Sequence, residues 1–81
     1  MPEVLEAFEA RKQAEAAALE AARQIRARAD AILGRAILQE RDKGTPQGEI
    51  ARKIGRTREQ VRRYQDAYGD WLKEHNGKEP G

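Results

Sequence analysis

The 81-residue sequence contains no cysteine, a single histidine, four aromatic side chains and three prolines. Without cysteine there are neither disulfides nor thiolate ligands, and one histidine cannot form a structural zinc site. No apolar run is long enough to span a bilayer, and the N-terminal residues do not have the pattern of a signal peptide. We therefore expect a cytoplasmic protein whose small core is stabilised by helix packing or by self-association.

The residues that enzymes need are also missing. The carboxylates are scattered among cations, so no pair is predicted for acid/base chemistry. The sequence has no P-loop, no cluster of metal ligands and no Ser/His/Asp set. We predict no enzymatic activity, no catalytic residue, no metal site, no cofactor and no small-molecule ligand.

The residues that are abundant favour helices. Alanine, glutamate, arginine, leucine and glutamine dominate, whereas β-branched and aromatic residues are few and no stretch alternates as a strand does. Between Glu3 and Lys43 there is no proline, and the only glycine is Gly34. The sequence predicts an all-α fold that begins with one long helix, about 60 Å if unbroken. The helix could break near Gly34, because glycine weakens helices, or in its alanine-rich part.

The second half of this long helix has an apolar face at helical spacing, which we expect to pack against later helices. This face contains Ala18, Ala22, Ile25, Ala29, Ile32, Leu33, Ala36 and Ile37.

Residues 1–22 have no strong core of their own and are predicted to form an N-terminal helical extension. Three roles stay open for this extension: a solvated helix, a docking element for a partner, or a dimerisation element that pairs with its own copy. A weak heptad seam is compatible with Leu5, Phe8, Leu19 and Ala22. Its other positions carry Lys12, Glu15 and Arg26, so a long coiled coil is a poor fit for this seam.

Turn signals divide the rest of the chain. Gly44 suits the position just after a helix, Thr45 is expected to be an N-cap, and Pro46 is expected to be the first residue of a short helix that ends near Lys53. Gly55 follows and suits a left-handed turn.

The last helix has a strong start signal, because Thr57 and Gln60 match the T-x-x-Q capping box. A bend is possible at Gly69, and His75-Asn76-Gly77 is a stop signal, after which residues 77–81 are predicted to be a disordered tail. The apolar stripe of this helix is Val61, Tyr64, Tyr68 and Leu72, with Trp71 at its edge. We expect it to pack against Ile25, Ala29, Ile32, Leu33 and Ala36.

The segment EIARKIGRTREQVRRY resembles the helix-turn-helix of bacterial repressors, of site-specific resolvases and of the promoter-reading region of sigma factors. The small residue, the turn glycine and the branched apolar residue of that pattern are Ala51, Gly55 and Val61, with Ile50 and Ile54 as core residues. The resemblance covers roughly residues 31–64. It departs from the pattern at Arg56, where many members have an aliphatic residue. It implies a three-helix DNA-binding domain, which we place at residues 23–76, with the preceding long helix as its first helix.

Charge is distributed unevenly. Residues 1–22 carry a net charge of −3, residues 23–63 a net charge of +7 and residues 64–81 a net charge of −2. Between Arg52 and Arg63 there are six basic residues and only one acidic residue, Glu59. Such a cationic segment favours a polyanionic partner.

These residues divide into two predicted groups of DNA contacts. Residues in the first turns of a helix that enters the major groove meet base edges, whereas the surrounding cations and polar groups bind phosphates. The predicted base-reading residues are Glu59, Gln60, Arg62 and Arg63. The predicted phosphate-binding residues are Gln47, Arg52, Lys53, Arg56, Thr57 and Arg58.

The predicted function is sequence-preferring binding of double-stranded DNA by a homodimer. This suits a small bacterial transcriptional regulator or an accessory factor of a mobile element, located in the cytoplasm on the nucleoid. One alternative is a weakly specific nucleoid or DNA-packaging protein. A second alternative is a helical protein-interaction adaptor whose basic face meets an acidic partner.

Overall fold

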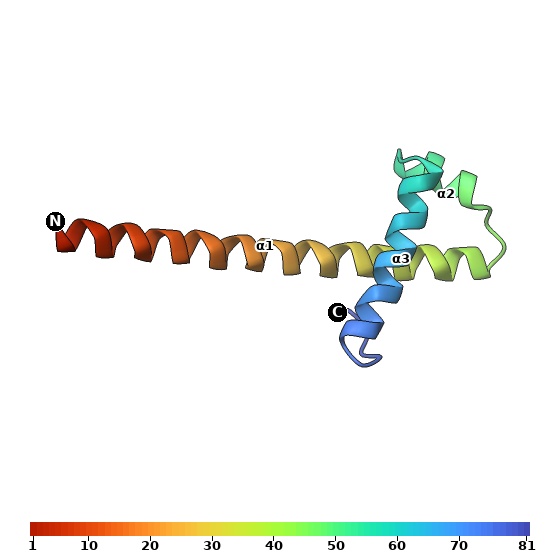
Figure 1. The fold of residues 1–81 in the computed structure, drawn as a ribbon. Helices are drawn as coiled ribbons and strands as arrows, with labels where there is room; N and C mark the ends of the chain where they lie inside the picture. The colour runs from red at the N-terminus through yellow and green to blue at the C-terminus, as the bar shows by residue number, and fades with distance from the viewer.

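The computed structural model describes all 81 residues and contains three helices and no strand, so the predicted all-α fold with a long first helix is confirmed. The helices are α1 (Pro2–Asp42), α2 (Gln47–Ile54) and α3 (Arg58–Glu74). Figure 1 shows α1 as a long rod, with α3 crossing it near its C-terminal end and α2 beside the start of α3. None of the three helices is both long enough and apolar enough to span a membrane.

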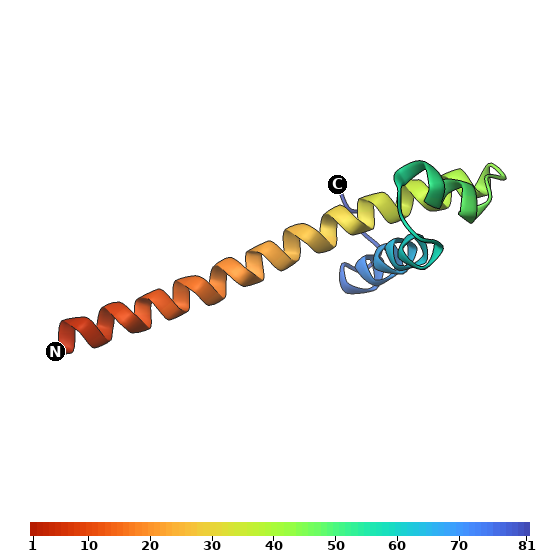
Figure 2. The same cartoon turned by 90° about the horizontal axis from the view of Figure 1, so that it is seen from above.

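The molecule is elongated because α1 is one uninterrupted helix of 41 residues. Its principal extents are 65 × 29 × 16 Å and its radius of gyration is 18.4 Å. A compact chain of this length would have a radius of gyration of about 12 Å. The N-terminal half of α1 therefore projects away from the other helices, as Figure 2 shows from above.

Every residue from Met1 to Arg26 is exposed, and Ala27 is the first residue of α1 that is partly buried. Ion pairs along the helix, such as Arg11 with Glu15 at 3.1 Å, give only local support. Such pairs are worth about 0.2–0.5 kcal/mol each. The first half of α1 is thus a helix without tertiary contacts of its own.

The hydrophobic core lies where the three helices meet. Its buried members are Ile37 from α1, Ile50 and Ala51 from α2, and Val61 from α3, with Leu33 and Tyr64 packed against them. Ile54, expected to be a core residue, is instead 40% exposed. It is the last residue of α2, where the helix ends and the chain turns toward α3.

Gly34 marks the point where α3 crosses α1. A Cβ atom at this position would come within 2.7 Å of the Tyr64 carbonyl carbon and would overlap the carbonyl oxygen. It would also lie 3.1 Å from the Cβ of Tyr68. Ala31, one turn earlier, is completely buried. Gly34 does not break α1. Its lack of a side chain lets the backbone of α3 approach that of α1 closely.

The predicted packing face of α1 is wrong for most of its residues. Ile25 is 71% exposed and Ile32 is 39% exposed, and Ala29 and Ala36 are exposed too, while Leu33 is partly buried. Helix α3 crosses too closely for isoleucine side chains at the contact, so it packs against the opposite face of α1, with Ala31 and Gly34. One apolar face of α1 is left uncovered. We call it the seam face, and it contains Ala18, Ala22, Ile25, Ala29, Ile32 and Ala36.

The connection between α1 and α2 follows the predicted turn at Gly44, which has a φ of +102°. Thr45 is not the N-cap of α2. Its hydroxyl donates to the Glu40 carboxylate at 2.7 Å, so it is committed to the end of α1. Pro46 is the N-cap, in an extended conformation and without a side-chain hydrogen bond, and α2 therefore begins at Gln47.

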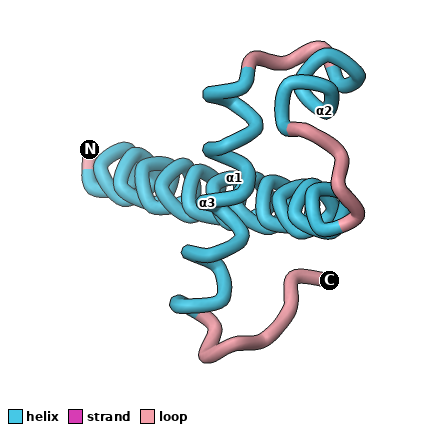
Figure 3. Tube along the Cα trace, turned by 90° about the vertical axis from the view of Figure 1, so that its right-hand side faces the viewer, coloured by secondary structure: helices cyan, strands magenta, loops and turns pink.

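The C-terminal segment is packed, so the prediction of a disordered tail at residues 77–81 is wrong. Figure 3 shows the chain turning back after α3. The Glu79 carboxylate accepts hydrogen bonds from the Tyr68 hydroxyl at 2.7 and 2.8 Å and lies 3.4 Å from the Arg35 guanidinium. The Trp71 indole N–H donates to the Lys78 carbonyl at 3.1 Å, and Pro80 is buried. The segment closes over the place where α3 leaves α1.

Candidate nucleic-acid interface

The turn between α2 and α3 is set by Gly55, which has a φ of +68°. This left-handed conformation is inexpensive for glycine and strained for residues with a Cβ. The amide of Arg56 donates to the Ala51 carbonyl at 2.9 Å, and the amide of Gly55 donates to the Arg52 carbonyl at 3.3 Å. Two carbonyls at the end of α2 are thereby satisfied, and α3 begins three residues after the turn glycine.

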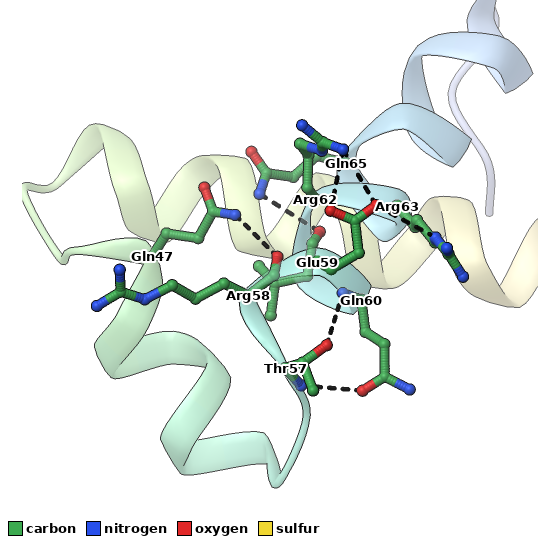
Figure 4. Close-up of polar contacts among 9 residues, drawn as sticks. Gln47, Thr57, Arg58, Glu59, Gln60, Arg62, Arg63 and Gln65 are labelled. Carbon is green, nitrogen blue, oxygen red and sulfur yellow. Dashed lines mark hydrogen bonds and ion pairs between the residues drawn. The ribbon is translucent and has the colours of Figure 1, made fainter.

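The predicted capping box at the start of α3 is present. The backbone N–H of Gln60 donates to the Thr57 hydroxyl oxygen at 3.1 Å, and the backbone N–H of Thr57 donates to the Gln60 side-chain oxygen at 2.9 Å (Figure 4). This arrangement satisfies two backbone groups at the N-terminus of the helix. It also engages the side-chain oxygen of Gln60, so that only the NH₂ group of this predicted base-reading residue is free to donate.

Gln47 and Arg58, predicted to bind phosphates, also connect the two helices. The Gln47 amide nitrogen donates to the Arg58 carbonyl at 3.0 Å. The Arg58 guanidinium lies over Gly48, where an added Cβ would be 2.7 Å from one of its nitrogens. Gly48 thus leaves room for this side chain along α2. Arg58 makes no ion pair and keeps its charge on the surface.

Glu59 lies between the two arginines that were predicted to read bases. Its carboxylate accepts hydrogen bonds from one nitrogen of Arg62 at 2.9 and 3.0 Å, and Nε of Arg63 lies 3.6 Å away (Figure 4). All three side chains are more than half exposed. Exposed ion pairs contribute about 0–1 kcal/mol, so they can be exchanged for stronger partners.

The remaining predicted phosphate-binding cations, Arg52, Lys53 and Arg56, are exposed and form no ion pair. They lie at the end of α2 and in the turn. The predicted site residues lie on α2, in the turn and in the first two turns of α3, and all of them except Gln47 are exposed. The only carboxylate among them is Glu59.

Sequence reasoning missed Arg41 and Gln65. The Arg41 guanidinium donates to the Gln65 side-chain oxygen at 3.0 Å, and the Gln65 nitrogen donates to the Val61 carbonyl at 3.4 Å. This contact places another cation from α1 beside the first turns of α3. A basic residue in the last turn of α1 was the available signal, but its approach to α3 depends on the crossing at Gly34.

Comparisons of this chain with protein-family models, with curated proteins and with solved structures give no match. No group of three or more His, Cys, Asp or Glu side chains lies together where it could hold a metal ion. We therefore infer the function from the geometry and charge of this surface.

Proposed function

We propose that α2 and α3 form a helix-turn-helix that binds double-stranded DNA, with the first turns of α3 in the major groove. The observation that carries this proposal is that the segment from Arg52 to Arg63, which spans the α2–α3 turn, exposes six cations and only one carboxylate, Glu59. The left-handed Gly55 and the capping box fix the orientation of the two helices that present these charges. A helix fits the major groove, and residues near its N-terminus reach base edges.

Arg62 and Arg63 contact the base edges, because a guanidinium can donate hydrogen bonds to O6 and N7 of one guanine at the same time. For this the arginines exchange the Glu59 carboxylate for DNA, and Glu59 becomes free to accept from a cytosine amino group. The Gln60 NH₂ group is the remaining donor in this turn. Arg52, Lys53, Arg56 and Arg58 bind phosphates together with Gln47 and Thr57, which positions α3 without reading sequence.

The test begins with selection of bound duplexes from a random pool, followed by fluorescence anisotropy with the selected duplex. We expect the double substitution of Arg62 and Arg63 by alanine to weaken binding at least tenfold, since each base contact is worth about 1–3 kcal/mol. The matched control removes Lys73 and Lys78, which lie at the far end of α3 and beyond it, and lowers the net charge equally. Loss of binding that is equal in both variants would contradict the assigned interface.

Comparing selected with random duplexes across salt concentrations tests sequence preference. A regulator or mobile-element factor binds its selected site roughly 10³-fold or more tightly than random DNA. A ratio near one identifies the weakly specific nucleoid alternative, whose affinity depends on salt alone. Absence of duplex binding even at low salt leaves the protein-interaction adaptor.

A further inference from the structure

The seam face of α1 has the spacing of a coiled coil. Its six residues follow one another at intervals of 4, 3, 4, 3 and 4, which is the a/d pattern of a heptad repeat. All six lie outside the contact with α3, and Ile25 in the middle is 71% exposed. Four of the six are alanines, whose small side chains let a second helix approach closely. The pattern therefore fits another helix with the same repeat.

Charge indicates how such a helix would be oriented. Residues 1–22 of α1 carry a net charge of −3, whereas residues 23–43 contain six basic and three acidic residues, a net charge of +3. A parallel pair would place like charges side by side along its whole length. It would also place Arg11 opposite Arg11 and Glu15 opposite Glu15, because these residues occupy the next two seam positions. An antiparallel pair places the acidic half of each helix against the basic half of the other.

We propose that the seam face binds α1 of a second copy of this chain in an antiparallel coiled coil. In the register that overlaps nearly all of both helices, each residue lies opposite the partner residue for which the two residue numbers add up to about 47. It places Ala22 opposite the partner's Ile25 and Ala18 opposite the partner's Ala29, so isoleucine meets alanine near the centre. In this register no arginine faces the same arginine of the partner. Arg26 and Arg28, which form no ion pair within the chain, flank the seam near the partner's acidic half.

This dimer leaves the proposed DNA-binding surface free. Helix α3 lies on the opposite side of α1 from the seam face, and Figures 1 and 2 show α2 and the start of α3 displaced at right angles to that direction. The two-fold axis of an antiparallel pair is perpendicular to the plane of its helices. Both helix-turn-helix units would therefore point to the same side of the dimer.

The register also sets the distance between the two units. The crossings at Gly34 would lie about 32 Å apart along the helix axis, because 21 residues at 1.5 Å each separate them. This is near the 34–36 Å of one DNA turn that separates half-sites. This consequence alone rests on the proposed function, since the dimer itself is independent of DNA binding.

Single cysteines test the orientation without DNA, because the chain has no cysteine of its own. In the proposed register two copies of Ala18→Cys lie about 16 Å apart, as do two copies of Ala29→Cys, beyond the reach of a disulfide. A mixture of the two variants brings the new thiol of Ala18→Cys in one chain to the new thiol of Ala29→Cys in the other. We expect oxidation to give a disulfide-linked dimer from the mixture at least tenfold faster than from either variant alone.

Sedimentation at increasing protein concentration gives the mass in the same buffer. The wild type is expected to form dimers that Ile25→Asp dissociates, whereas Gln24→Asp, the same charge introduced on the neighbouring exposed position outside the seam, leaves them intact. A monomer mass at every concentration overturns the proposal, and so does a dimer that Ile25→Asp does not affect. Disulfides that form equally well within each single variant identify a parallel pair and overturn the antiparallel orientation. Because no DNA is present, these outcomes are separate from failure of DNA binding.

Discussion

A single glycine, Gly34, decides how closely α1 and α3 of this protein approach each other. At Gly34 the α3 backbone occupies the space in which a Cβ would lie, whereas at Gly69, inside α3, nothing lies within 4 Å of such an atom. Both lie within helices, and neither has a positive φ. The same residue type therefore has a packing role at one position and none at the other.

Alanine substitutions at these two glycines are expected to have opposite effects on stability. Gly34→Ala should lower the free energy of unfolding by about 1–3 kcal/mol, because the crossing has to widen to admit the methyl group. Gly69→Ala should raise it by up to about 1 kcal/mol through better helix propensity. Urea unfolding followed by circular dichroism measures both. An increase in stability for Gly34→Ala would show that the helices do not cross at this distance.

At the scale of elements, the C-terminal segment is held to α3 by a hydrogen bond that depends on protonation. The Tyr68 hydroxyl donates to the Glu79 carboxylate. This hydrogen bond raises the pKa of Tyr68 above its ordinary value of 10.0, with smaller contributions from burial and from the Glu79 charge, while Arg35 acts in the opposite direction. Ionised tyrosine has no proton to donate and would repel the carboxylate.

The contact should therefore be stable to neutral and moderately alkaline pH and be lost in strong alkali. A pKa that is raised in the folded state contributes stability that is complete below the ordinary value of 10.0 and disappears as pH rises through the raised value. We expect Trp71 fluorescence to report the release, because its indole N–H donates to the Lys78 carbonyl in this segment. Tyr68→Phe should remove the alkaline transition of the tail. A transition of the same amplitude in that variant would show that Tyr68 is not the group responsible.

For the whole molecule, the main feature is that only the C-terminal part of α1 contributes to the hydrophobic core, while its long N-terminal part extends beyond it. Residues of the core lie within the last third of this helix and in α2 and α3, while the first 26 residues are exposed. Isolated helices are only marginally stable in water, and most helical stability in proteins comes from tertiary packing. The two parts of α1 should consequently differ in local stability.

Hydrogen exchange in dilute solution is expected to show this difference. Amides of residues 5–22 should exchange faster than those of residues 31–41, although both belong to one helix. If α1 pairs with a second copy, raising the protein concentration should slow exchange in the first group while the second changes less. Equal protection of both groups in the most dilute sample would contradict the absence of contacts along the first half.

The proposed interface could be predicted from the sequence because its signals are local. Thr57 and Gln60 lie within one helical turn, and Gly55 marks a left-handed turn by its residue type alone. The position of Ile50, Ala51 and Val61 in the core also follows from their spacing. The engagement of Arg62 and Arg63 by Glu59 lies within the reach of i, i+3 and i, i+4 pairs as well.

The sequence by itself determined the all-α fold, the turns at Gly44 and Gly55 and the cationic surface of α2 and α3, since each depends on neighbours in the chain. Only the tertiary structure decided which face of α1 is buried. Spacing favoured the face with Ile25 and Ile32, but a close crossing requires small residues, and Gly34 supplies the smallest. The packing of Glu79 and Pro80 could not be predicted from the sequence either, because their partners lie far away in sequence and meet them only after the helices have crossed.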